Sequence, residues 1–218
     1  MSGYRKDLLR EIYERMFAAF GPQKWWPAET AFEVILGAIL TQNTAWKNVA
    51  VAIGNLRRYG LLNFDSVCGL GAAELAAIIR SSGFYNQKAK KVKTFCNHIQ
   101  TNWGGILEEF LAQNADALRT DLLAIRGIGP ETADSIVLYA AFKPSFVVDA
   151  YTYRIFSRHG WVDESISYEE LREYFMGAME PDVALFQEFH ALLVRTGHLY
   201  CRKKPLCDSC PLNVFLAR

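Results

Sequence analysis

The sequence contains no run of 18 or more apolar residues, which excludes a membrane-spanning helix. Its first segment, MSGYRKDLLREIYERM, lacks the unbroken apolar stretch of a signal peptide, so we expect a cytoplasmic protein. Low-complexity segments, long linkers and repeats of fixed period are also absent from the 218 residues. With 51% hydrophobic and 22% charged residues, the chain is neither disordered nor collagen-like and is long enough to bury a core.

Neither sign of charge dominates, because 24 basic residues stand against 23 acidic ones and the formal net charge is +1. This total neither indicates nor excludes binding to nucleic acid, since the clustering of charges matters more than their sum. The five cysteines are an odd number, and a disulfide framework is not expected in a cytoplasmic protein. Three of them, Cys201, Cys207 and Cys210, lie within ten residues and indicate a metal site.

Strand-like alternation is almost missing, and the best stretch, residues 146–148, is too short to pair into a sheet. Helical periodicity runs through most of the chain instead, which predicts an all-α fold with short loops. The predicted helices cover residues 4–20, 31–40, 46–59, 72–81, 85–101, 115–124, 130–142, 150–159, 168–179 and 182–197.

The most informative stretch, residues 118–142, contains two glycines between two predicted helices. The turn consists of Arg126, Gly127, Ile128 and Gly129. Pro130 follows and suits the first turn of a helix, where its missing N–H is not needed. Glycine tolerates positive φ, so the turn can point N–H groups outward just before a helix N-terminus, where a phosphate binds well. A plain close-packed helix–helix connection is the alternative.

Asp149 is a second candidate, because it follows an apolar triplet about twenty residues after the hairpin and precedes a predicted helix. As an N-cap, its carboxylate would accept backbone N–H hydrogen bonds in the positive field of the helix end. Both effects favour the ionised form. Taken alone, the position is explained best by a helix cap with no further role.

The pattern L-x-x-I-x-G-I-G-P-E-T-A-x-x-I and the Val148–Asp149 pair together resemble the helix-hairpin-helix superfamily of base-excision DNA glycosylases, the endonuclease III group. Residues 39–44 (ILTQNT) and 82–89 (SGFYNQKA) are similar to further segments of that group, and the resemblance covers roughly residues 28–211. It implies two helical lobes with a DNA-binding cleft between them. The first would be a central bundle, residues 23–142, and the second would combine residues 1–22 with 143–218 and carry the cysteine loop.

The resemblance also implies roles for single residues. Asp149 would stabilise the positive charge that builds on the sugar as the glycosidic bond breaks, after the target nucleotide has left the stack. Gln42 would fill the vacated space and Phe84 would wedge into the stack from the opposite side of the duplex. The hairpin would grip one strand through phosphate without reading bases. The expected basic contacts are Lys88, Lys90, Lys91 and Lys93, then Arg126, and then Arg202, Lys203 and Lys204.

Bifunctional members carry a lysine at the start of the second hairpin helix, where it forms a Schiff base with the sugar and cuts the strand. Glu131 occupies that position here, and a carboxylate cannot form the imine. The resemblance therefore predicts a monofunctional glycosylase, a monomer that acts on double-stranded DNA and associates with the nucleoid through it. A glycosylase/lyase for oxidised or mismatched bases and a non-catalytic DNA-binding module are the alternatives.

Aromatic residues in the first quarter of the chain look like those of the bacterial 3-methyladenine glycosylases of the endonuclease III type, which stack the alkylated base. Such a base is already cationic and needs little protonation, whereas a π surface attracts it once it is desolvated. Packing in the core is the alternative for the tryptophans. The predicted base pocket consists of Trp26, Pro27, Trp46 and Glu131.

The cysteine spacing, Cys201-x5-Cys207-x2-Cys210, resembles the C-terminal [4Fe–4S] loop of the family, C-x6-C-x2-C-x5-C. The first gap is one residue short, and Leu216 stands at the fourth position. The resemblance implies a structural [4Fe–4S] cluster on three cysteines, with the fourth ligand unassigned and His198 as a candidate. A Cys3His zinc site and an empty site are the alternatives.

Overall fold

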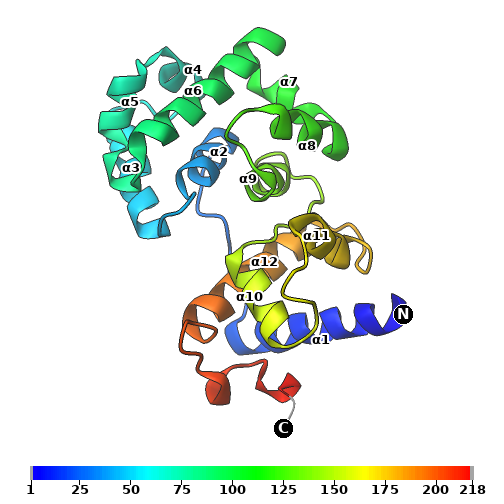
Figure 1. Ribbon diagram of the computed structural model, residues 1–218. Coiled ribbons are helices and arrows are strands. Elements are labelled where there is room, and N and C mark those ends of the chain that lie inside the picture. Colours follow the sequence, from blue (N-terminus) through cyan, green and yellow to red (C-terminus); the bar gives the residue numbers. More distant parts are fainter. Residues whose placement is uncertain (1, 217–218) are drawn as a thin grey trace. The chain divides into compact units, whose positions relative to one another are not determined.

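The computed structural model describes residues 2–216, and within that range every regular element is helical (Figure 1). The all-α class is thereby confirmed. The α-helices are α1 (Ser2–Phe20), α2 (Ala31–Leu40), α3 (Trp46–Arg58), α4 (Phe64–Gly69), α5 (Ala72–Ile78), α6 (Tyr85–Asn102), α7 (Leu107–Ala112), α8 (Ala115–Ala124), α9 (Pro130–Ser135), α10 (Ala150–Arg158), α11 (Tyr168–Met176) and α12 (Val183–Leu199). Short turns η1 (Arg80–Ser82), η3 (Cys207–Ser209) and η4 (Asn213–Phe215) are 3₁₀-helical. None of the helices described is long and apolar enough to cross a membrane.

The ten predicted helices all occur, with ends that differ by a few residues. Helices α4 and α7 were not predicted, because six residues are too few to display an apolar period. The predicted helix 130–142 is α9 followed by a π-helical turn, η2 (Ile136–Ala140). Such wider turns inside a helix are rare and occur often at functional sites.

The chain divides into two compact units. Unit 1 consists of Met1–Trp25 and Pro144–Arg218, and unit 2 of Trp26–Lys143. The boundaries therefore lie at 25/26 and 143/144, where the sequence predicts 22/23 and 142/143.

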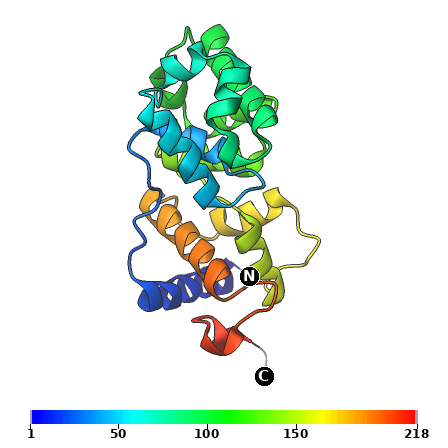
Figure 2. The same cartoon turned by 90° about the vertical axis from the view of Figure 1, so that its left-hand side faces the viewer.

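Unit 1 is organised around α12, which packs against α1 and α10 (Figure 1, Figure 2). Its core is aromatic: Phe146 stacks on Phe175 with ring centroids 3.8 Å apart, and Phe189 lies edge-on to both. The triplet Phe146–Val148 is fully buried as irregular chain that leads into α10. Asp149 therefore follows a segment that the aromatic core holds in place.

Unit 2 is organised around α2, in which nine of ten residues are buried. The helix packs against α3, α6, α9 and η2. Its one charged residue, Glu33, is buried as well, and Oε1 accepts a hydrogen bond of 2.8 Å from Arg57 Nη2. Because α2 is enclosed in this way, the turn after Leu40 starts from a fixed point.

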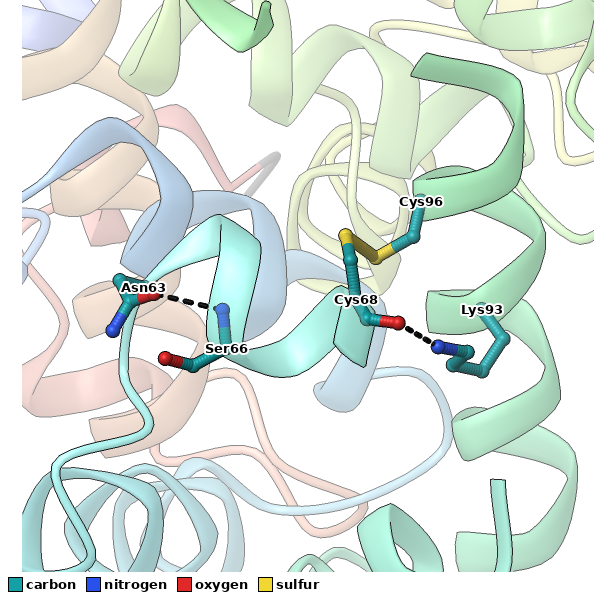
Figure 3. The surroundings of a disulfide bond; sticks show 5 residues. All are labelled: Asn63, Ser66, Cys68, Lys93 and Cys96. Atoms are coloured by element: carbon teal, nitrogen blue, oxygen red, sulfur yellow. Dashed lines mark hydrogen bonds between the residues drawn. A yellow bond between two sulfur atoms is a disulfide. The ribbon is translucent and has the colours of Figure 1, made fainter. Parts of the chain in front are cut away.

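Cys68 of α4 and Cys96 of α6 form a disulfide within unit 2 (Figure 3). The expectation that the cysteines form no disulfide framework is therefore wrong for this pair. The physical reason is that α4 packs on α6 and brings the two Cα atoms to 5.5 Å, inside the range that a disulfide spans. The Lys93 ammonium donates a hydrogen bond to the Cys68 carbonyl beside the bond.

Candidate functional site

The predicted hairpin is formed by α8 and α9 in unit 2, and a buried ion pair joins its two helices. Arg119 Nε and Nη2 donate hydrogen bonds of 2.8 and 3.1 Å to the two carboxylate oxygens of Asp134, which is fully buried. Ile128, at the tip, points inward and is 5% exposed. A bidentate guanidinium–carboxylate pair fixes the relative orientation of the two helices as well as their separation, so the turn between them has a rigid base.

Only one of the two hairpin glycines adopts a conformation that requires glycine. Gly127 has a φ of +101°, whereas Gly129 has a φ of −96° and caps α9 with extended backbone. Within the described residues, neither amide N–H donates a hydrogen bond to another backbone group. Two unpaired N–H groups ahead of a helix start are suited to an anion such as phosphate.

We expect Gly127→Ala to weaken DNA binding. Gly129→Ala should keep both the fold and the DNA affinity of the wild type. A Cβ on Gly127 would cost about 1–2 kcal/mol for the left-handed backbone. It would also lie 2.7 Å from Lys91 Cγ, whereas a Cβ on Gly129 meets nothing within 4 Å. Fluorescence anisotropy with duplex DNA and urea unfolding of both variants would check this. Equal affinities for the two variants would contradict a role of the Gly127 turn.

Gln42, predicted to act on DNA, lies against the hairpin in this structure. Its Nε2 donates to the Gly127 carbonyl at 3.2 Å and to Thr132 Oγ1 at 3.0 Å. Its Oε1 accepts a hydrogen bond from Lys91 Nζ. The side chain thus links the turn after α2, the hairpin and α6. The aliphatic part of the Lys91 side chain also lies against Gly127. The sequence did not indicate this packing.

Phe84 is an exposed aromatic residue on a strained turn. It is 64% exposed, and it adopts the left-handed region (φ 46°, ψ 28°) as the N-cap of α6, directly after Gly83 at φ +66°. A non-glycine residue in that region is strained, and such strain gathers at functional sites. Asn43, next to Gln42, is also left-handed at φ 55°.

Lys88 does not lie on a basic surface, so its predicted contact with DNA is wrong. The residue is 2% exposed, and its Nζ donates to the Leu40 carbonyl at 2.8 Å and to the Ser82 carbonyl at 2.6 Å. Burial lowers the pKa of Lys88, and the nearby charge of Lys91 lowers it further. The ammonium therefore ties the backbone ahead of Asn43 to the backbone ahead of Phe84.

The other predicted basic contacts differ in exposure. Lys93 is engaged with the Cys68 carbonyl and Lys91 with Gln42, so neither projects freely. The side chains that do face solvent are Lys90, Arg126, Arg202, Lys203 and Lys204. Of the basic residues expected to contact DNA, unit 2 therefore exposes Lys90 and Arg126, and unit 1 exposes the run 202–204.

Aromatic rings gather at the predicted base pocket in unit 2. Trp26 lies edge-on to Trp46 with centroids 5.3 Å apart, and it meets Tyr139 of the π-helical turn at the same distance. Gly37 of α2 makes room for the indole, because a Cβ there would lie 3.1 Å from Trp26 Cζ2. Sequence reasoning missed Tyr139. Both tryptophans are half-buried, which leaves part of each ring accessible.

Two further residues of the predicted pocket lie at the surface. Pro27 is exposed beside Trp26, and Glu131 is exposed in the first turn of α9. A carboxylate in that turn interacts favourably with the helix dipole.

Asp149 forms the expected N-cap of α10 and leaves one oxygen for other partners. Its Oδ1 accepts hydrogen bonds from Thr152 N at 2.7 Å and Thr152 Oγ1 at 2.9 Å. Its Oδ2 lies 3.8 Å from Nε2 of His190 on α12, a neighbour that the sequence did not reveal. Burial lowers the pKa of His190, and the Asp149 charge partly offsets this. A neutral imidazole leaves the charge of the carboxylate uncompensated.

The three C-terminal cysteines line one cavity of about 260 Å³ in unit 1. Arg158 Nη1 lies 3.5 Å from Cys201 Sγ in hydrogen-bond geometry, and Leu216 also lines the cavity. Burial raises the pKa of the Cys210 thiol, a hydrogen bond from the Leu212 backbone lowers it, and the nearby thiols raise it further. Three thiols around one space are a donor set that suits iron or zinc.

His198, the candidate for the unassigned fourth ligand, is not among the residues that line this cavity. It is exposed near the end of α12, where its carbonyl accepts a hydrogen bond of 2.9 Å from Arg202 Nε. A different histidine, His159 at the end of α10, lines the cavity instead. Burial lowers the pKa of His159, and a hydrogen bond with the Phe215 backbone partly offsets this.

Three comparisons with known proteins agree with this geometry. Residues 36–181 match the family described as HhH-GPD superfamily base excision DNA repair protein. A relative from Methanocaldococcus jannaschii, named provisionally as a DNA repair glycosylase, is 46% identical over 211 residues, which cover 96% of each chain. The 3-methyladenine DNA glycosylase of H. pylori bound to 1,N6-ethenoadenine is 28% identical, with a TM-score of 0.75 over 89% of this chain and 97% of that chain. A non-covalent endonuclease III–DNA complex, 22% identical, shares the fold with a TM-score of 0.81 over 97% of this chain and 94% of that chain.

Proposed function

We propose that this chain removes an alkylated, 3-methyladenine-like base from DNA. The chain belongs to the HhH-GPD superfamily of base excision DNA repair proteins and is a DNA repair glycosylase. The proposed reaction is hydrolysis of the N-glycosidic bond, which leaves an abasic site in an uncut strand. The substrate is double-stranded DNA that contains the damaged base, and the protein acts as a monomer in the cytoplasm.

The aromatic cluster of unit 2 is the observation that carries the choice of lesion. Trp26, Trp46 and Tyr139 form three contiguous ring surfaces, two of them half-buried. A base with a fixed positive charge is attracted to such surfaces, and the attraction grows when water is excluded. The likeness to the 3-methyladenine DNA glycosylase of H. pylori supports the same substrate class. Pro27 and Glu131 would border the stacked base.

Asp149 supplies the negative charge that the proposed hydrolysis needs. A flipped nucleotide that loses its base passes through a sugar with oxocarbenium character, which a fixed anion stabilises. The Thr152 hydrogen bonds fix the position of Oδ1, and Oδ2 is left to face the sugar or a water molecule. The neutral His190 beside Oδ2 does not cancel the charge.

Glu131 supports a reaction that stops at the abasic site. A bifunctional enzyme needs an amine that attacks the sugar, and the exposed carboxylate at this position cannot form an imine. Water is then the acceptor of the sugar, and the phosphodiester backbone stays intact.

Contacts with the DNA backbone come, in this proposal, from the hairpin of unit 2. The unpaired amides of Gly127 and Gly129 donate to a phosphate, and the exposed Arg126 adds a charge. Phe84 inserts into the stack and Gln42 occupies the space that the nucleotide leaves. The second role requires Gln42 to exchange its hydrogen bonds with the hairpin for bonds with a base.

In this proposal Cys201, Cys207 and Cys210, which line one cavity, would hold a [4Fe–4S] cluster. Within residues 2–216, no three His, Cys, Asp or Glu side chains are close enough to share a single metal ion. One zinc ion held by the same thiols is the alternative. A cluster binds each ligand at a different iron and accepts wider spacing. When bound, it supplies a crosslink that holds the loop of Arg202, Lys203 and Lys204 in one conformation.

A panel of duplexes with single lesions tests the proposal. We expect release of 3-methyladenine and related alkylated bases, without release of thymine glycol, 8-oxoguanine or a mismatched thymine. Alkali should be needed to cut the product strand, and borohydride should trap no covalent adduct. Excision of an oxidised base alone would overturn the choice of lesion, and a trapped adduct would overturn the monofunctional reaction. Tight binding without release of any base would indicate a DNA-binding module.

Replacement of Trp46 separates stacking from packing in the same assay. Trp46→Phe keeps a ring at the edge of Trp26, whereas Trp46→Leu keeps apolar volume and removes the π surface. Stacking on a cationic base predicts that Phe preserves most of the base release and that Leu loses it. If the two variants are equally active, Trp46 contributes only to packing.

A further inference from the structure

We propose that His190 is a positioning residue that controls the charge of Asp149: the neutral imidazole leaves the carboxylate uncompensated, and the imidazolium pairs with it and slows base release. The proposal rests on the function put forward above, in which Asp149 stabilises the sugar as positive charge builds on it. Three observations within unit 1 carry it: the distance between the two groups, their burial, and the engagement of the neighbouring charges with other partners.

The imidazole of His190 and the carboxylate of Asp149 lie at the distance of an ion pair. Nε2 and Oδ2 are 3.8 Å apart, which is within ion-pair range but longer than a hydrogen bond. Helix α12 holds the ring there, because it packs on α10, which Asp149 caps. Thr152 donates both of its hydrogen bonds to Oδ1, so Oδ2 is the oxygen that faces the ring. A change of charge on the imidazole therefore acts on the oxygen that the proposed reaction uses.

Both groups are largely removed from solvent. The exposed fraction is 6% for the side chain of His190 and 13% for that of Asp149. Water and salt screen a charge interaction less at such a site than between exposed side chains. A proton taken up from solvent places an N–H on both ring nitrogens, so Nε2 then donates toward Oδ2 whichever neutral tautomer precedes it. Protonation of His190 thus sets a cation beside the catalytic anion.

Other charged side chains on the surrounding helices are engaged elsewhere. Glu188 of α12 accepts a hydrogen bond of 2.8 Å from the backbone N–H of Gln23, and Arg154 of α10 donates to the backbone of the cysteine loop. On α1, burial and the charge of Glu188 raise the pKa of the Tyr13 phenol, which therefore stays uncharged. The carboxylate of Asp149 is accordingly the charge to which His190 responds.

The expected result is a rate of base release that declines in acid. Burial lowers the pKa of His190 and the charge of Asp149 partly offsets this, so the imidazole protonates below about pH 6.5. Each further pH unit below that pKa should lower the rate about tenfold, because only molecules with a neutral imidazole keep the uncompensated anion. Alkylation itself gives a 3-methyladenine-like base its positive charge, so acid is not needed to activate the substrate.

The test measures single-turnover release from a 3-methyladenine duplex by saturating full-length protein between about pH 8 and pH 5. The wild type should slow in acid, whereas His190→Gln, with an uncharged amide, should give a rate that does not change with pH. The residual rate of Asp149→Asn should also be flat, since no carboxylate charge is left to compensate. The matched control is His98→Gln in unit 2, where His98 Nε2 lies 2.6 Å from Asp121 Oδ1. It should keep both the rate and the acid decline of the wild type.

A lowered pKa means that the folded protein binds this proton less readily than the unfolded chain, so stability also falls as the pH drops below the ordinary histidine value. Circular dichroism at each pH therefore checks that the protein is folded. Nuclear magnetic resonance titration of the histidine ring C–H signals measures the coupling without substrate. Asp149→Asn should lower the pKa of His190, because the lost charge raises it in the wild type.

Three results would overturn the proposal. They are an acid decline that survives in folded His190→Gln, a wild-type rate that stays flat down through the pH at which His190 titrates, and a pKa of His190 that is the same in Asp149→Asn. If His190→Gln does not fold, His190→Asn supplies an uncharged amide, and the titration of Asp149→Asn decides independently. Coupled titration in a protein that releases no base would contradict the proposed function and leave the coupling of the two groups intact.

Discussion

Asp149→Asn should bind lesion-containing duplex as tightly as the wild type and should release the base at least about 100-fold more slowly. Asparagine is as good an N-cap as aspartate, and its Oδ1 can accept the same hydrogen bonds from Thr152, so α10 is preserved. What disappears is the fixed negative charge near the reacting sugar. Single-turnover excision and fluorescence anisotropy, measured on the same duplex, would check the two halves of this prediction.

Asp182→Asn is the matched control. Asp182 caps α12 in the same unit, and its Oδ1 accepts a hydrogen bond of 3.0 Å from Leu185 N. The same chemical change at this exposed cap should leave base release unchanged. If Asp149→Asn keeps near wild-type excision, Asp149 is a helix cap and no more, and the proposed mechanism fails.

Lys88→Met should reduce the free energy of unfolding by about 1–3 kcal/mol, because two buried carbonyls lose their hydrogen-bond donor. It should also weaken binding to abasic DNA, since the backbone ahead of Asn43 and Phe84 loses its common anchor. Urea unfolding measures the first effect and anisotropy the second. The salt dependence of binding should stay that of the wild type, because the buried ammonium neutralises no phosphate.

Lys90→Met makes the identical change on the same helix at an exposed position. This variant should keep its stability, and the slope of log K against log salt should become shallower if Lys90 contacts a phosphate. If Lys88→Met instead keeps the stability of the wild type and makes the slope of log K against log salt shallower, Lys88 contacts a phosphate, as the sequence predicts.

The helical periodicity of α6 indicates that Lys88 is buried, whereas the run of basic residues does not. On α6 the buried residues are Lys88, Ala89, Val92, Phe95, Cys96 and Ile99. Lys88 therefore lies four residues before Val92, on the stripe that repeats every three to four residues and faces the core. Lys90 lies off this stripe. Periodicity thus separates the two lysines, whereas the count of basic residues groups them together.

Local patterns located the helices, the hairpin and the cap at Asp149, because each depends on residues within a few positions of one another. Partners that come from distant segments gave no local signal. His190 follows Asp149 by 41 residues and reaches it only because α12 packs on α10. Tyr139 joins Trp26 through the packing of η2 on α2 and the indole that lies over Gly37. The cavity near the C-terminal cysteines likewise includes His159 and not His198 in its wall, which spacing along the chain does not reveal.

The Cys68–Cys96 disulfide encloses a loop that contains α5, the Gly83–Phe84 turn and the first part of α6. Closing a loop with a sequence separation of 28 residues lowers the entropy of the unfolded chain by an amount worth about 3–4 kcal/mol. The same crosslink prevents this segment from separating from the bundle during partial opening. Amide hydrogen exchange around Phe84 should accordingly be slow in the oxidised protein and faster after reduction. In the role proposed for Phe84, the exposed ring would therefore contact DNA from a segment that is already ordered before binding.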